Sequence, residues 1–291
     1  MTDVERQILL QTICLPAAVT AGGLTVATLA AQRWPRARAP LVTLALALGF
    51  AAAEVAIRGW QDSWPADVIR RLPHAVLLVA AISVIRAALP CRWTGLFLSI
   101  MAAGIVAGTF ANTGVTAEFT TSEKAVWWCG IGSLFLASQL SLEQLAARRA
   151  TLPLCTLWAG CVGVSASLLA ASGSLSLGQV CGALAVCLAV AVVFAWRWPA
   201  LSMHAGPAEL VAVVFGVLMA AGHLFSELPR TAAILIALSL HAVWAGSIPW
   251  LQRRPWRGWI VQALVAIALL GSAAGIVIAN RPDETSNPYA N

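Results

Sequence analysis

Charged residues are scarce in this chain, and their scarcity identifies its solvent. Only 10% of the 291 residues are charged and 60% are hydrophobic, whereas soluble domains carry about 25% charged residues. The single lysine is Lys124, so that every other basic residue except histidine is an arginine. Segments between the apolar runs reach only about 16 residues, too few for a separate soluble domain. The composition therefore excludes a water-soluble protein and predicts one embedded in a lipid bilayer.

The chain also lacks the short motifs of common catalytic sites. It contains no His-Glu-x-x-His, no Gly-x-Ser-x-Gly and no Walker loop, and its seven cysteines form no Cys-x-x-Cys pair. Its basic residues are dispersed among short loops and form no patch of the kind that binds nucleic acid. We therefore expect no catalytic residues, no metal or cofactor and no nucleic-acid partner.

Apolar runs of membrane-spanning length fill the chain from residue 8 to residue 279. A helix needs about 20 apolar residues to cross a hydrocarbon core, and lipid offers the backbone no other hydrogen-bond partners. We predict an all-α, polytopic bundle of about ten spans within a single membrane domain, residues 1–279, followed by a polar, disordered tail, residues 280–291. The predicted spans are Ile8 to Ala31, Pro40 to Ile57, Pro73 to Leu89, Trp93 to Ala111, Ala125 to Leu145, Leu152 to Ala171, Leu177 to Trp196, Ala208 to Phe225, Thr231 to Trp250, and Trp256 to Ala279.

The distribution of basic residues between loops predicts the orientation. The odd-numbered loops hold eleven: Arg33, Arg36, Arg38, Arg86, Arg92, Arg148, Arg149, Arg197, Arg253, Arg254 and Arg257. The even-numbered loops hold five: Arg58, Arg70, Arg71, Lys124 and Arg230. Because cytoplasmic loops are enriched in arginine and lysine, we expect the odd loops in the cytoplasm and both termini outside the inner membrane.

A weak internal similarity relates the first four spans to the last four. The first and seventh spans both end in Arg-Trp-Pro, at Arg33 and Arg197, and the fourth and tenth share Trp-x-Gly and Gly-x-x-x-Gly. These matches suggest parallel halves, residues 8–111 and 177–279, joined by the fifth and sixth spans, an arrangement found in transporters. Chance resemblance between alanine-rich helices is the alternative.

Two pairs of glycines mark faces on which helices can approach closely. Gly104 and Gly108 lie one turn apart in the fourth span, as do Gly271 and Gly275 in the tenth. Small residues at this spacing allow close helix packing in lipid. We expect packing inside the monomer, with a homodimer or contact with other membrane subunits as the alternative.

Ionisable residues inside the apolar runs are the candidate functional residues. Such groups cost at least about 2.5 kcal/mol to insert, so they usually face protein, a partner or water. The candidates are Glu54, Arg58, His74, Arg86, Glu209, His223, Glu227 and His241. Glu54 and Arg58 stand four residues apart and should form a local ion pair. Alternatively, Glu54 and His223 carry protons or cations in a polar cavity toward the outer side.

The candidate residues are compatible with three different functions. A small carrier or permease with its polar site toward the outer side is the first, and a non-catalytic membrane subunit that packs against partners is the second. The third is a membrane enzyme whose arginines hold a lipid phosphate. Haem bound between His223 and His241 is disfavoured, because their depths in the bilayer should differ by roughly 9 Å.

Overall fold

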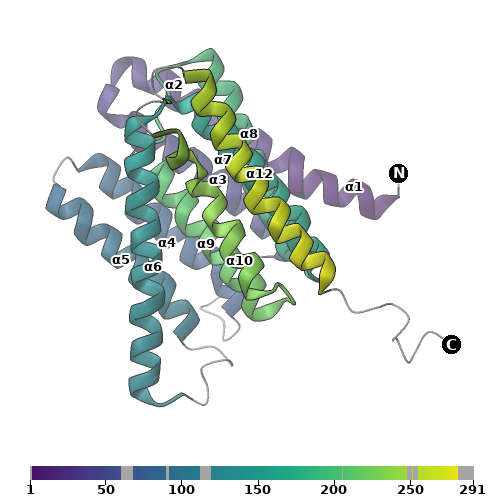
Figure 1. The fold of residues 1–291 in the computed structure, drawn as a ribbon. Helices are drawn as coiled ribbons and strands as arrows, with labels where there is room; N and C mark the ends of the chain where they lie inside the picture. Colours follow the sequence, from purple (N-terminus) through teal and green to yellow (C-terminus); the bar gives the residue numbers. More distant parts are fainter. Residues whose placement is uncertain are drawn as a thin grey trace.

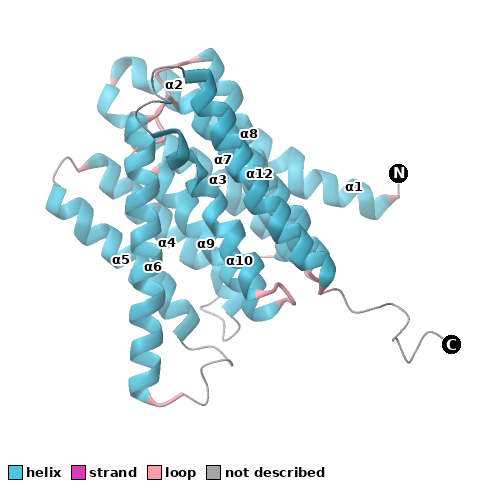
Figure 2. Cartoon of the chain, in the orientation of Figure 1, coloured by secondary structure: helices cyan, strands magenta, loops and turns pink. Residues whose placement is uncertain are grey.

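The chain folds into the predicted all-α bundle (Figures 1 and 2). A computed structural model describes residues 2–59, 68–89, 92–111, 119–204, 206–247, 251 and 255–280, and these ranges contain no strand. The helices are α1 (Asp3–Leu9), a π-helix η1 (Leu10–Cys14), α2 (Leu15–Arg33), η2 (Pro35–Ala37), α3 (Arg38–Arg58), α4 (Val68–Ala88), α5 (Arg92–Ala111), α6 (Thr121–Arg148), α7 (Thr151–Ala171), α8 (Leu175–Arg197), α9 (Pro207–Phe225), α10 (Arg230–Ser239), a 3₁₀-helix η4 (Leu240–Ser247) and α12 (Pro255–Ala279). Each predicted span corresponds to one of these helices or to consecutive segments.

Eight of the ten spans are helices long and apolar enough to cross a membrane. The third and ninth are shorter apolar helices, Leu77–Arg86 and Arg230–Gly246. The predicted bounds of the first span were too narrow, since its helical segment runs from Asp3 to Arg33. The protein is therefore a multi-pass membrane protein. The third span was predicted to start at Pro73, but its helix α4 begins earlier, at Val68. The predicted tail from Arg281 onward and the end of the ninth span at Trp250 lie outside what the structure describes.

Local sequence signals explain where several helices begin. The Thr120 side chain accepts a hydrogen bond from the Glu123 backbone N–H, and the Glu123 carboxylate accepts one from the Thr120 N–H, which together form a capping box at the start of α6. In the first span, Pro16 cannot donate to the carbonyl of Thr12 and its ring would collide with that carbonyl in an α-helix. The π-helix η1 widens the helix at this point.

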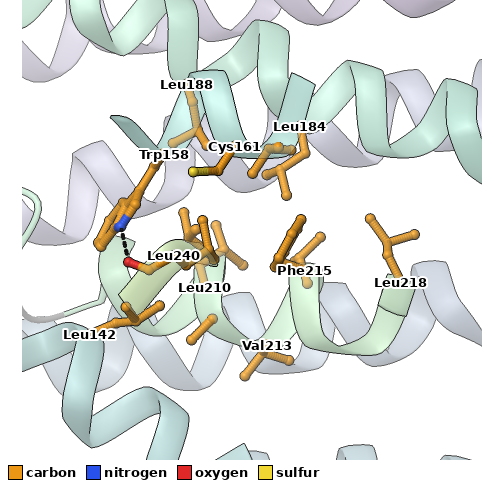
Figure 3. Close-up of a cluster of buried hydrophobic side chains, with 14 of the residues drawn as sticks. Leu142, Trp158, Cys161, Leu184, Leu188, Leu210, Val213, Phe215, Leu218 and Leu240 are labelled. Atoms are coloured by element: carbon orange, nitrogen blue, oxygen red, sulfur yellow. Dashed lines mark hydrogen bonds between the residues drawn. The ribbon is translucent and has the colours of Figure 1, made fainter. Parts of the chain in front are cut away.

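The most buried helix is α9. In its apolar stretch 72% of the residues are buried, compared with 22% in the first span and 28% in α12, so α9 is enclosed by other helices and those two face lipid. It packs against α3, α4, α5, α6, α8 and α10. Gly216 permits one of these contacts, because a Cβ at that position would lie 2.6 Å from Cε1 of Phe135 on α6. Leu210, Phe215 and Leu218 of α9 extend the core toward α7 and α8 (Figure 3).

The connections between helices define two ends of the bundle. At one end α2 meets α3, α6 meets α7 and α8 meets α9, at the top of Figure 1. This end carries the odd-numbered loops of the sequence and is called the odd-loop end below. The opposite end, called the even-loop end, includes the Phe225–Arg230 connection and the end of α12 at Ala279.

Candidate polar site within the helix bundle

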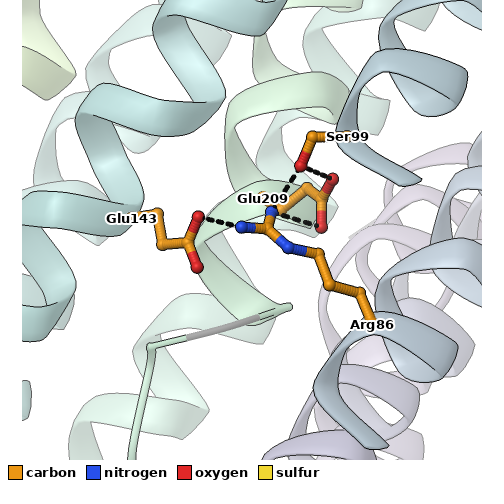
Figure 4. A network of polar contacts seen from close by, with 4 residues as sticks. All are labelled: Arg86, Ser99, Glu143 and Glu209. Carbon is orange, nitrogen blue, oxygen red and sulfur yellow. Dashed lines mark hydrogen bonds and ion pairs between the residues drawn. The ribbon is translucent and has the colours of Figure 1, made fainter. Parts of the chain in front are cut away.

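A charged cluster joins four helices near the odd-loop end (Figure 4). Arg86 of α4 places Nη1 3.2 Å from Oε2 of Glu209 on α9, and its Nη2 pairs with Oε2 of Glu143 on α6. Arg86 Nη1 also donates to Oγ of Ser99 on α5 at 2.6 Å, and that hydroxyl donates to Oε1 of Glu209 at 3.2 Å. Arg86, Ser99, Glu143 and Glu209 are called the Arg86 cluster below.

The positions of these residues along their helices bring them to a common depth. Arg86 lies two residues before the end of α4, Glu143 lies five before the end of α6, and Glu209 lies two after the start of α9. At 1.5 Å per residue, all three are within about 8 Å of the odd-loop end of their helices. Glu209 also lies in the first turn of α9, where the helix dipole favours a negative charge. Gly95 of α5 leaves room for Arg86, since a Cβ there would lie 3.3 Å from Nε.

The cluster is nearly closed to solvent and its charges do not cancel. The exposed fraction of the side chain is 0% for Glu209, 9% for Arg86 and 16% for Glu143. One guanidinium faces two carboxylates, so the ionised cluster has a formal charge of −1. Burying net charge is costly unless further polar groups compensate it. The arrangement is therefore suited to binding one additional positive charge.

Two more buried polar side chains lie one helical turn deeper. Gln139 precedes Glu143 by four residues on α6, and Ser83 precedes Arg86 by three on α4. Both are fully buried, and neither the Gln139 amide nor the Ser83 hydroxyl has a hydrogen-bond partner in the described part of the chain. Because α4 and α6 both pack on α9, these groups extend the polar zone of the Arg86 cluster toward the centre of the bundle.

The Glu54–Arg58 ion pair predicted from the sequence is present at the even-loop end of α3. Arg58 Nη1 lies 3.4 Å from Oε1 of Glu54, and Arg58 Nε donates to Oγ of Ser176 at 3.2 Å. Glu54 is fully buried. The contact with Ser176 ties α3 to the first turn of α8, so this pair also joins two helices.

His241 lies between two hydroxyls of α6. Its Nε2 is 3.2 Å from Oγ of Ser138 and its Nδ1 is 3.0 Å from Oγ of Ser141, which also accepts a hydrogen bond from the Trp244 indole at 2.8 Å. His223 instead contacts the Leu228 carbonyl, with Nδ1 and the oxygen 3.1 Å apart, in the turn after α9.

The candidate residues lie at both ends of the bundle. Arg86 is at the odd-loop end, Glu54 and Arg58 are at the even-loop end, and half-buried His74 lies near the start of α4. Glu227 is exposed in the same turn as Leu228. The sequence analysis missed Ser99 and Glu143 as partners of Arg86. Glu143 could have been found, because it is an acidic residue inside the predicted fifth span.

The ninth span, predicted from Thr231 to Trp250, is not one continuous α-helix. It changes from α10 to the 3₁₀-helix η4 at Leu240. Neighbouring helices bind the carbonyls around the change: Trp158 Nε1 donates to the Leu240 oxygen at 3.2 Å (Figure 3), and Gln262 Nε2 donates to the Val243 oxygen at 3.2 Å. Irregular backbone at membrane depth requires such partners. Gly246 accommodates Gln262, since a Cβ there would collide with its amide.

The two glycine pairs have different surroundings. Gly104 and Gly108 face the Trp128 ring of α6, and Trp128 Nε1 donates to the Gly104 carbonyl at 3.2 Å, so this pair packs inside the monomer as predicted. A Cβ at Gly271 or Gly275 would meet nothing within 4 Å. That face of α12 is therefore open in the monomer.

No protein-family model matches the chain, and no curated protein or solved structure shows significant similarity to it. In the part of the chain that the structure describes, no three histidine, cysteine, aspartate or glutamate side chains gather as metal ligands. The class defined by the fold is the multi-pass helical membrane protein, and function has to be argued from the polar groups inside the bundle.

Proposed function

We propose that this protein is a small carrier-like transporter in which the Arg86 cluster takes up a proton or a small cation. The observation that carries the proposal is the charge of the cluster, one guanidinium against two carboxylates at the junction of four helices. One proton or monovalent cation neutralises it. Ionisable groups inside membrane bundles commonly mark ion and proton pathways, because their insertion cost is retained only where function requires it.

The broken ninth span supports the same proposal. Transporters often build their sites beside discontinuous helices, whose irregular backbone lines a cavity or packs against protein. Here η4 carries His241, which contacts Ser138 and Ser141 of α6, and Glu143 of the Arg86 cluster lies on the same helix. Movement of η4 against α6 would therefore reach both the histidine and the cluster.

Reconstitution into proteoliposomes tests the proposal. A pH-sensitive dye is enclosed, and a panel of amino acids, sugars, organic cations and inorganic cations is applied from outside. We expect at least one compound to produce a pH change with the wild-type protein that is lost in Glu209→Gln. Glu123→Gln is the matched control, because Glu123 is exposed in the first turn of α6. A compound-dependent signal that is equal in Glu209→Gln and in the wild type would contradict the proposal.

We place this carrier in the inner membrane. The arginine bias between the loops favours an orientation with the odd-loop end on the cytoplasmic side. The Arg86 cluster then lies near the cytoplasmic end of the bundle. The parallel repeat of residues 8–111 and 177–279 remains part of the proposal, as does a second polar site toward the outer side around Glu54 and His223.

A second candidate function is that of a subunit that assembles through α12. Gly271 and Gly275 form an open small-residue face on a helix that is mostly exposed, the kind of face on which transmembrane helices associate. Cross-linking in membranes tests this: the wild type should give a dimer that Gly271→Leu/Gly275→Leu abolishes, while Gly160→Leu, at an equally open glycine of α7, keeps it. A monomer in all three proteins would exclude self-association through this face.

A further inference from the structure

A cavity lies at the odd-loop end, apart from the Arg86 cluster. It has a volume of about 600 Å³ and lies between the α6–α7 connection, η4 and the first turns of α12. Arg148 and Arg149 line it on one side, Gly246 belongs to its η4 wall, and Trp259 and Gln262 belong to its α12 wall. No residue of the Arg86 cluster is among those that line it. It is called the arginine cavity below.

The charge of its wall has one sign. Both charged residues among the described lining residues are arginines, and no carboxylate is found with them. The guanidinium of Arg148 lies 5.6 Å from the centroid of the Trp244 ring, a cation–π contact that holds the side chain at the wall. Glu143, five residues before Arg148 on α6, is engaged by Arg86. An anion entering the cavity would therefore meet two positive charges.

The start of α7 adds to this positive potential. The N-cap residue Ala150 has no side chain that could accept from the first backbone N–H groups, and Ala150 and Pro153 both line the cavity. The Thr151 hydroxyl donates to the Leu201 carbonyl at 2.7 Å and so ties the helix start to the α8–α9 connection. Pro153 has no backbone N–H and the Leu154 N–H donates to the Ala150 carbonyl, so this helix start contributes through the positive end of its dipole.

We propose that the arginine cavity binds a phosphate group. Arginine recognises phosphate through two parallel hydrogen bonds, and Arg148 and Arg149 place two guanidinium charges on one wall of this cavity. The phosphate can belong to the headgroup of an anionic lipid, since the cavity lies at the end of the bundle where headgroups are found, or to a small phosphorylated solute.

Binding measurements on the purified, delipidated full-length protein test this. Phosphatidylglycerol and phosphatidylcholine, each in detergent, and inorganic phosphate are titrated into the wild type and two variants. Arg148→Gln/Arg149→Gln removes both cavity charges, and Arg33→Gln/Arg36→Gln removes two exposed charges at the same end of the bundle. We expect the wild type and the Arg33/Arg36 variant to bind phosphatidylglycerol in preference to phosphatidylcholine, and the Arg148/Arg149 variant to bind it at least ~10-fold more weakly.

The ligands distinguish the two sources of phosphate. Tight binding of phosphatidylglycerol with weak binding of inorganic phosphate supports the lipid headgroup, and the reverse supports a phosphorylated solute. If the glutamine variant does not purify as a single species, Arg148→Lys/Arg149→Lys replaces it, and weaker binding than in the Arg33/Arg36 variant supports the proposal because lysine lacks the planar fork. The proposal would be overturned if the cavity variant bound phosphatidylglycerol and inorganic phosphate as tightly as the Arg33/Arg36 variant does.

Discussion

Arg86 and Glu209 come from opposite halves of the chain, yet Nη1 and Oε2 lie 3.2 Å apart inside the bundle. Their contact joins α4 to the enclosed helix α9, and through Arg86 it also includes Glu143 of α6. Stability and the proposed carrier activity therefore depend on the same side chains, and substitutions in the cluster need separate measurements of each.

Removing the guanidinium should destabilise the protein strongly. We expect Arg86→Gln to lower the free energy of unfolding by about 3–5 kcal/mol, because two carboxylates then remain buried without their partner. Thermal or denaturant unfolding in detergent measures this. Arg36→Gln, at an exposed position of the same end, should change stability by no more than about 0.5 kcal/mol. A loss in Arg86→Gln no greater than in Arg36→Gln would show that the cluster does not stabilise the fold.

The close approach of α6 and α9 should be sensitive to one added methyl group. Gly216→Ala places a Cβ against the Phe135 ring, which is itself buried, and we expect a loss of about 1–3 kcal/mol from the resulting shift. Gly160→Ala is the matched control, since its Cβ would enter open space on α7. There the substitution should leave stability unchanged or increase it slightly. Equal melting temperatures for the two variants would mean that α6 can move away at no cost.

The broken ninth span should loosen when its side-chain partners are removed. Trp158→Phe keeps the buried ring but removes the indole donor to the Leu240 carbonyl, and the loss of this hydrogen bond should cost about 0.5–1.5 kcal/mol. Hydrogen exchange of residues 240–247 should rise in this variant. Trp256→Phe, at an exposed ring of α12, provides the comparison. Unchanged exchange in Trp158→Phe would show that η4 does not need this hydrogen bond.

The orientation can be tested with a fluorescent protein fused after Asn291. If both termini lie outside the inner membrane, the fusion should be dark in bacterial cells, since the fluorophore does not mature after export through the membrane in an unfolded state. An alkaline phosphatase fusion at the same position should then be active. A bright fluorescent fusion with inactive phosphatase would reverse the orientation and place the Arg86 cluster and the arginine cavity on the outer side.

Features that depend on neighbouring residues in the chain could be predicted from the sequence. The spans follow from runs of about 20 apolar residues, the Thr120 capping box from its spacing, and the Glu54–Arg58 pair from two charges on one helix face. Each of these needs only a helix of known geometry. No knowledge of how the helices pack is required.

Features that depend on packing between helices could not be predicted. Arg86 finds its partners on three other helices, and the hydropathy pattern gives no indication of which spans are neighbours. The break at Leu240 is equally hidden, because the residues from Thr231 onward remain apolar and contain no proline before the break. The structure shows carbonyls at the break paired with Trp158 and Gln262, which lie in spans that no local signal connects to it.

The order of the Arg86 cluster along the chain also has a consequence for biosynthesis. Arg86, Ser99 and Glu143 are all translated before Glu209, so the ribosome has already delivered α4, α5 and α6 when α9 emerges. The enclosed helix α9 is thus made after the helices that pair with it. Its only acidic residue, Glu209, enters a membrane that already holds the Arg86 guanidinium. Nascent chains truncated before α9 should therefore expose Arg86, Ser99 and Glu143 without Glu209 to the insertion and quality-control machinery.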